Sequence, residues 1–105
     1  MFEVVRYQAP DGTQPFTQWC SGLDKHAATR VDFAVRRMAD GNLADTKSVG
    51  AGVLERRIDW GPGYRIYFGR DGNRVVVLLG GGTKQRQQVD IERVKVRWSA
   101  YKQRR

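Results

Sequence analysis

The chain has 105 residues, a net charge of +8 and 40% hydrophobic residues. This length and composition exclude a disordered chain and fit one domain with a modest core, so we expect residues 1–105 to form a single domain. No apolar run approaches the roughly 18 residues that a membrane span needs, and we expect a cytoplasmic protein that does not associate with membranes. Six of the eight net positive charges lie from Lys84 onward, and this excess favours a polyanionic partner.

The sequence contains one cysteine, Cys20, and one histidine, His26. A single cysteine cannot form an internal disulfide, and the two residues lack the spacing of a zinc site. We expect Cys20 to be a small buried side chain and His26 to be a surface or cap residue. The sequence therefore predicts no metal and no cofactor.

The first part of the chain predicts one strand and two helices. Alternation of residue type over Phe2 to Tyr7 is typical of a short strand. Thr13 is a plausible cap for a first helix, which Ser21-Gly22 interrupts. Asp24 can cap a second helix, and Gly41-Asn42 ends it.

The second part predicts a connection, three strands and a final helix. Residues Asp45 to Gly52 are small and polar, and we interpret them as a flexible connection. The elements that follow are strands over Val53 to Trp60, Tyr64 to Arg70 and Arg74 to Leu79, the last ended by Gly80-Gly81-Gly82, and a helix beginning near Gln85 to Gln88. Gly61-Pro62-Gly63 and Asp71-Gly72 mark two hairpin turns.

The predicted fold class is α+β, in the order β-α-α-β-β-β-α. The two turns predict adjacent antiparallel pairs, so we expect a mostly antiparallel four-stranded sheet with helices packed against it. The third of the late strands is apolar on both faces and is expected to be central. The rest of the strand order is left open by the sequence.

A polar group of residues is expected on one face of the first late hairpin. If the apolar residues of both strands point to the core, one set is left together on the outer face: Glu55, Arg57, Arg65 and Tyr67. Lys84 and Gln85 follow the central strand and can extend this group. Arginine binds phosphate, tyrosine stacks on a base or donates its hydroxyl, and glutamate holds an arginine in place. The alternative is an ordinary solvated sheet face with weak Glu–Arg pairs.

The same segment resembles HigB-like toxins of the RelE/ParE superfamily. Their pattern is roughly Glu-Leu-Arg-aliphatic, a turn, then Tyr-Arg-aliphatic-Tyr-Phe; this chain has Leu-Glu-Arg-Arg-Ile-Asp-Trp-Gly-Pro-Gly-Tyr-Arg-Ile-Tyr-Phe. The continuation Val-Val-Val-Leu-Leu-Gly-Gly-Gly-Thr-Lys-Gln and the later Asp-Ile-Glu-Arg are also similar. The resemblance is specific from Gly52 to Tyr101. Arg56 departs from it, standing where the family has leucine, which suggests a snorkelling arginine at an edge or a shifted register.

The resemblance implies a RelE-like fold and cleavage of messenger RNA in the ribosomal A site. It also implies a cognate antitoxin, usually of the helix-turn-helix type. The residues carried over as catalytic are Arg57, Arg65, Tyr67 and Lys84. We hypothesise that the RNA 2′-hydroxyl is the nucleophile, that the three cations stabilise charge, and that Tyr67 orients the nucleotide or exchanges a proton.

Supporting and binding roles complete this hypothesis. Glu55 is expected to position Arg57, and Gln85 to support the site. Contact with RNA or the ribosome is assigned to Lys47, Arg86, Arg93 and Arg97. Tyr101 and the tail at 102–105 are candidates for antitoxin contact. We also expect Arg65 to be exposed.

Two other functions remain open at this point. ParE-like members of the superfamily share the scaffold but poison DNA gyrase and do not cut RNA, because fold does not fix function. A basic nucleic-acid-binding module without toxicity is the third possibility.

Overall fold

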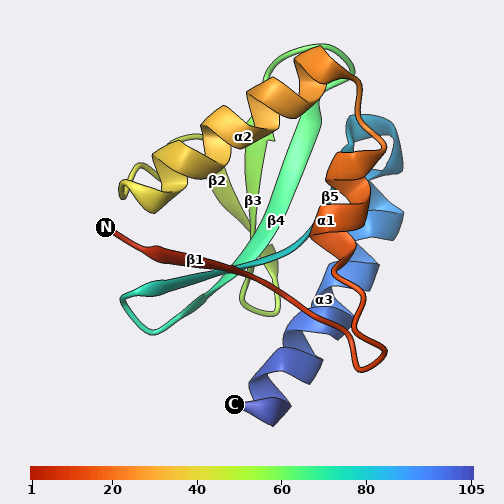
Figure 1. Ribbon diagram of the computed structural model, residues 1–105. Helices are drawn as coiled ribbons and strands as arrows, with labels where there is room; N and C mark the ends of the chain where they lie inside the picture. The colour runs from red at the N-terminus through yellow and green to blue at the C-terminus, as the bar shows by residue number, and fades with distance from the viewer.

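A five-stranded sheet forms the centre of the molecule (Figure 1). The structure is a computed structural model, and it describes residues 1–105. In chain order the elements are β1 (Glu3–Arg6), α1 (Pro15–Ser21), α2 (Lys25–Ala39), β2 (Thr46–Gly50), β3 (Val53–Ile58), β4 (Tyr64–Asp71), β5 (Val75–Thr83), the 3-10 turn η1 (Lys84–Arg86) and α3 (Gln87–Arg104). None of the helices is both long and apolar enough to span a bilayer.

The sheet is mixed, with strand order β1-β5-β4-β3-β2. Strand β1 runs parallel to β5, and the other neighbours are antiparallel, including the two predicted hairpins. The α+β class is confirmed, as is the central place of the apolar strand, here β5. The prediction of a four-stranded sheet is wrong, because there is one more strand.

The additional strand is β2, within the segment that we predicted to be a flexible connection. It forms an edge of the sheet, so its side chains Lys47 and Ser48 stay exposed and only Val49 packs toward the core. An edge strand of this kind lacks the apolar alternation by which strands are recognised. Ala51 and Gly52 close the β2–β3 hairpin with φ of 56° and 83°, as a tight hairpin turn requires.

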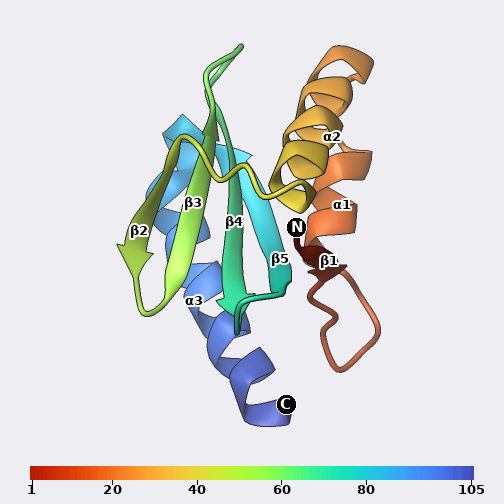
Figure 2. The same ribbon diagram turned by 90° about the vertical axis from the view of Figure 1, so that its left-hand side faces the viewer.

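Both faces of the sheet are covered by helices. Figure 2 shows α1 and α2 on one face and α3 on the other. One core cluster joins α1 and α2 to side chains such as Ile66 and Phe68, and a second joins α3 to Val53, Tyr67 and Val77. The face of β3 and β4 that we expected to be open therefore lies largely beneath α3.

The helix boundaries follow local capping chemistry. The Asp24 carboxylate accepts a hydrogen bond of 2.9 Å from the Ala27 amide, which confirms it as the cap of α2. Gly22 ends α1, as predicted. The cap of α1 is Gln14, and Thr13 instead hydrogen-bonds to Asp11, so that prediction was one residue early.

Glycines allow the helices to lie close to the sheet. We predicted that Gly80-Gly81-Gly82 ends the central strand, but β5 continues through these residues to Thr83. A side chain at Gly81 would overlap the ring of Trp19 from α1, and one at Gly82 would overlap the Asp90 carboxylate from α3. On β4, a Cβ at Gly69 would lie 2.6 Å from the ring of Trp98. The absence of side chains at these glycines leaves room for the large side chains of the helices.

Replacement of Gly69 by alanine should therefore destabilise the protein. Because the new methyl group overlaps the Trp98 ring, the ring or α3 must move, and we expect a loss of about 1–3 kcal/mol in the free energy of unfolding, measured with urea. Gly22→Ala is the matched control, since its Cβ would come no closer than 3.7 Å to another atom. Equal stability of the two variants would contradict this packing.

Candidate functional site

Three of the four predicted catalytic residues surround one hollow at the end of the sheet. Arg57 and Arg65 face each other directly in the β3–β4 register and therefore share a face, and Lys84 follows β5 at the same end. The Lys84 amide donates a hydrogen bond of 2.9 Å to the Gly63 carbonyl, which ties it to the β3–β4 turn. We call this hollow of about 310 Å³ the sheet-end cleft; its lining is Asp45, Arg57, Ile58, Asp59, Gly63, Tyr64, Arg65 and Lys84.

The cations of the sheet-end cleft differ in exposure. Arg57 and Lys84 are exposed, but Arg65 is only 7% exposed, so its predicted exposure was wrong. Arg65 Nε donates a hydrogen bond of 2.7 Å to the Glu55 carboxylate, and Nη1 donates one of 2.8 Å to the Gly63 carbonyl. These bonds fix the guanidinium at the floor of the cleft.

Glu55 is fully buried and has a different partner from the one we predicted. It was expected to position Arg57, but its carboxylate pairs with Arg65 and also accepts two hydrogen bonds from Gln87 Nε2, at 3.0 and 3.3 Å. Gln87 therefore takes the supporting role that the sequence suggested for Gln85, which is exposed and lines neither this cleft nor the one described below. The helical register of α3 was the signal that could have selected Gln87.

Tyr67 is not part of the cleft. It is fully buried beneath α3, in the cluster with Val94 and Trp98, and its hydroxyl has no hydrogen-bond partner. Burial raises the pKa of Tyr67 far above its usual value, and the nearby Glu55 carboxylate raises it further. The predicted role of this residue in orienting a nucleotide or exchanging a proton is therefore not compatible with its position.

Arg56 lies on the face covered by α1 and α2, without any shift of register. It pairs with Ile66 across the strands, and its Nη1 donates a hydrogen bond of 3.3 Å to the Asn42 carbonyl after α2. Burial lowers the pKa of Arg56, although Asp45 nearby acts in the opposite direction. Because β3 is an internal strand, Arg56 does not snorkel at a sheet edge. Its guanidinium instead contacts the segment between α2 and β2.

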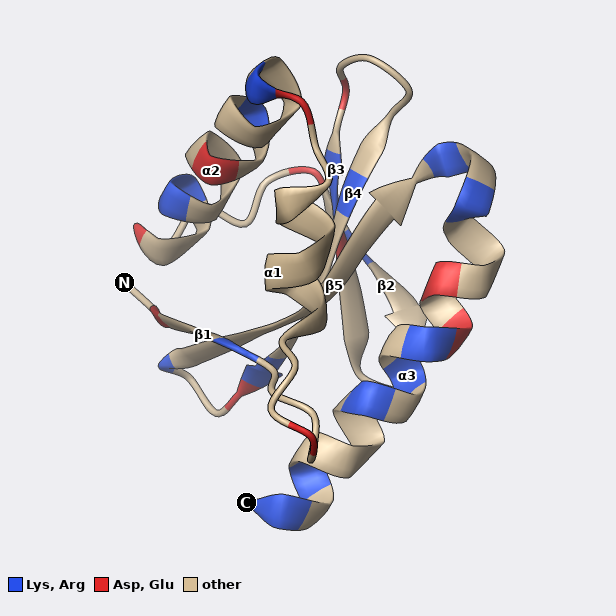
Figure 3. Ribbon diagram, turned by 45° about the vertical axis from the view of Figure 1, so that its right-hand side comes forward, with Lys and Arg blue, Asp and Glu red and all other residues tan.

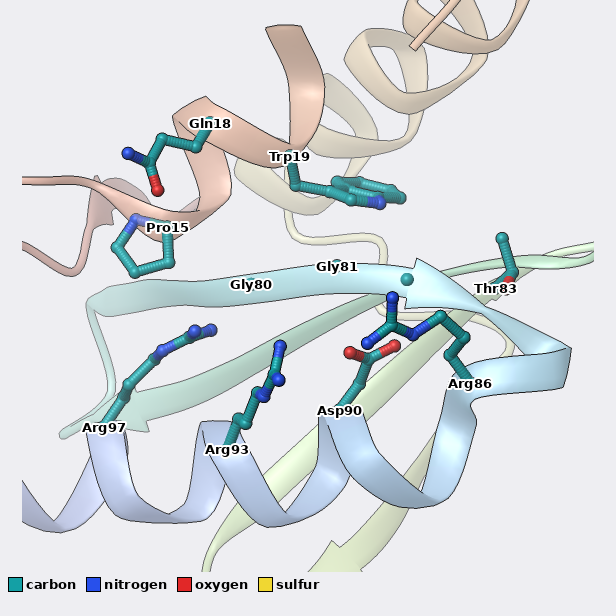
Figure 4. Close-up of a pocket in the computed structure, with 11 residues that line it drawn as sticks. Pro15, Gln18, Trp19, Gly80, Gly81, Thr83, Arg86, Asp90, Arg93 and Arg97 are labelled. Atoms are coloured by element: carbon teal, nitrogen blue, oxygen red, sulfur yellow. The ribbon is translucent and has the colours of Figure 1, made fainter. Parts of the chain in front are cut away.

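Three of the four arginines and lysines assigned to RNA contact gather at a second hollow. Figure 3 shows the basic residues along α3, and Figure 4 shows Arg86, Arg93 and Arg97 beside β5. We call this hollow of about 430 Å³ the interhelix cleft; its lining is Pro15, Gln18, Trp19, Gly80, Gly81, Gly82, Thr83, Arg86, Asp90, Arg93 and Arg97. Lys47 lies apart from it, exposed on the edge strand β2.

Asp90 is the single carboxylate in the interhelix cleft. Burial raises its pKa, and the nearby Arg86, Arg93 and Arg97 partly offset that effect. It forms no salt bridge with them, and its Oδ2 atom is buried without a hydrogen-bond partner. No pattern in the sequence identifies Asp90 or Trp19 as a site residue, because their positions depend on the glycines that face them.

The buried pair of Arg65 and Glu55 gives a direct test of this geometry. Removal of the carboxylate in Glu55→Ala leaves a buried guanidinium without its anion, and we expect a loss of about 3–5 kcal/mol in unfolding free energy. The control is Asp32→Ala, which breaks the exposed pair with Arg36 and should change stability by no more than about 0.5 kcal/mol. Urea denaturation measures both, and similar values would show that Arg65 and Glu55 are not buried together.

Comparison with known proteins shows a similarity to a bacterial protein. No family model matches the chain. A protein of Haemophilus influenzae, described as uncharacterized, is 39% identical to it over 85 residues, which are 80% of this chain and 86% of that protein. Because the identity extends over most of both proteins, the chain belongs to the family of this Haemophilus influenzae protein.

Proposed function

We propose that the chain is the toxin of a type II toxin–antitoxin pair, with a RelE-like fold, and that it inhibits translation by cutting messenger RNA at the ribosome. Two observations support this proposal. The segment from Gly52 to Tyr101 resembles HigB-like toxins, and the residues that carry the resemblance include all three cations of the sheet-end cleft. We also propose that it acts in the cytoplasm, where ribosomes are.

The observation that carries the proposal is the convergence of Arg57, Arg65 and Lys84 on the sheet-end cleft. A phosphodiester under attack develops negative charge on its non-bridging oxygens, and fixed cations stabilise that charge more strongly than they stabilise the substrate. Arg65 is held in place by two hydrogen bonds, whereas Arg57 and Lys84 are free to meet the phosphate. The cleft thus combines one rigid cation with two adjustable ones.

Without Tyr67, the proton transfers fall to other groups of the cleft. The RNA 2′-oxygen attacks the adjacent phosphorus, its proton passes to the carboxylate of Asp59 or Asp45, and the bond from phosphorus to the 5′-oxygen breaks. The Lys84 ammonium supplies the proton for the departing 5′-oxygen, and a 2′,3′-cyclic phosphate remains. A carboxylate is a weak base, so precise placement of the RNA by the ribosome would supply much of the acceleration.

The burial of Tyr67 also favours a second candidate function. A toxin of the ParE type poisons DNA gyrase and needs no proton-exchanging tyrosine in its site. In that case the cations would bind the target without cutting a phosphodiester. DNA double-strand breaks in expressing cells, with intact messengers, would identify this function.

The proposed antitoxin needs a surface on the toxin. The C-terminal tail was assigned to it, yet Tyr101 and Arg105 both donate hydrogen bonds to the carboxylate of Asp71 at the end of β4, at 2.8 and 2.7 Å. The antitoxin would therefore meet an ordered helix end, or would have to displace these bonds. A helix-turn-helix partner encoded beside this chain remains the proposal.

Replacement of a cleft cation by alanine should strongly reduce the cleavage. We expect Lys84→Ala and Arg57→Ala each to reduce messenger cleavage in a translating extract by about 10²-fold. Each variant lacks one cation that would stabilise the negative charge of the transition state. Primer extension on the extracted messenger measures the cuts. Wild-type protein should give none when ribosomes are withheld.

The matched control is Lys25→Ala, which removes an exposed lysine at the start of α2 that lines neither cleft. It should cleave like the wild type, and all three variants should keep the wild-type melting temperature because the changed side chains are exposed. Normal growth of cells that express the wild-type chain alone would refute both toxin functions. Full cleavage by both cleft variants would refute the role of the sheet-end cleft.

A further inference from the structure

The interhelix cleft has the form of a channel along a bare strand. Figure 4 shows α1 on one side and α3 on the other, with β5 between them. Gly80, Gly81 and Gly82 contribute only backbone to the lining. Trp19 forms part of one wall, and the arginines of α3 form the other.

The charge of this cleft is largely uncompensated. Arg93 and Arg97 are four residues apart on α3, which places them on one side of that helix, and Arg86 ends η1 just before it. Arg97 Nη1 donates a hydrogen bond of 3.0 Å to the Leu79 carbonyl, so it is partly engaged by the protein. Arg86 and Arg93 take part in none of the salt bridges and are exposed. Three cations against one carboxylate leave an anion-binding surface.

An aromatic ring lies opposite these cations. Trp19 is half-buried, held over Gly81 and against the edge of Tyr64, whose ring centroid is 6.2 Å away. A fixed indole beside arginines is the combination by which proteins bind single-stranded nucleic acid, because bases stack on the ring while phosphates meet the cations. An acidic peptide would use the charge but has no need of the ring.

The two clefts are adjacent along the chain. Thr83 lines the interhelix cleft and the next residue, Lys84, lines the sheet-end cleft. Across the strands, Gly82 of the first cleft pairs with Arg65 of the second. A polymer that carries one negative charge on every unit can therefore occupy both clefts at once.

We propose that the interhelix cleft binds the single-stranded RNA that continues from the phosphate held in the sheet-end cleft, with Arg86 and Arg93 at phosphates and Trp19 against a base. This inference rests on the proposed function, since it takes RNA as the substrate of the neighbouring cleft. Trp19 and the arginines are positioning residues in this assignment, because they act on the RNA away from the reacting atoms.

Binding of a fluorescein-labelled RNA of about ten nucleotides, followed by fluorescence anisotropy, tests the assignment. Arg93→Ala should weaken binding about tenfold, the effect of one lost charged hydrogen bond. It should also reduce the slope of log K against log salt by about 0.7, the value for one phosphate contact on a single strand. Arg74→Ala is the matched control, an exposed arginine in the β4–β5 turn, and should leave binding within about twofold of the wild type.

A second variant should act in the opposite direction. Asp90→Asn removes the carboxylate among the three arginines while keeping the size of the side chain, so the RNA should bind roughly threefold more tightly. A merely structural role for Asp90 would not increase affinity. Unchanged or weaker binding by a folded Asp90→Asn protein would count against the charge arrangement.

The outcomes separate this inference from the proposed function. Arg93-dependent RNA binding without any messenger cleavage by the wild type would support the inference for the cleft and refute the nuclease. Messenger cleavage by the wild type, with equal RNA binding by Arg93→Ala and Arg74→Ala, would overturn the inference alone. A poly-glutamate peptide that displaces the RNA at lower concentration than unlabelled RNA does would also overturn it, because the cleft would then favour an acidic peptide.

Discussion

The buried Glu55 carboxylate joins the elements on which the candidate site depends. It lies on β3, accepts a hydrogen bond from Arg65 on β4, and accepts two from Gln87 in the first turn of α3. A buried carboxylate without such partners would be very costly, so the three elements meet there in one arrangement. Arg65 consequently has a fixed place at the floor of the sheet-end cleft, and the N-terminal turn of α3 is fixed between the two clefts.

Most of the secondary structure could be predicted from the sequence, and the reasons are local. The cap at Asp24, the Asp-Gly turn and the apolar run of β5 each specify their own element with a few neighbouring residues. Strand β2 was missed because an edge strand buries few side chains and shows little alternation. The parallel pairing of β1 with β5 joins residues about seventy positions apart, and no local pattern encodes such a contact.

The candidate site was predicted in part, and the errors have one cause. Alternation along β3 and β4 correctly placed Arg57 and Arg65 on the same face. The alternation could not show that α3 would cover that face, because the apolar stripe of α3 can pack on either face of the sheet. Tyr67 and Glu55 therefore became buried residues, while Arg57, nearer the sheet end, remained exposed. Gln87 and Asp90 acquired their roles through the same docking of α3.

The glycines of β4 and β5 have a consequence for how sequences of this family can diverge. Gly81 faces Trp19, and Gly69 faces Trp98, with no space for a methyl group between them. Each glycine and its tryptophan therefore form a unit that can change only together, with a larger residue on the strand matched by a smaller one on the helix. Paired substitution at these positions among relatives would be the evolutionary trace of helices packed directly on a bare backbone.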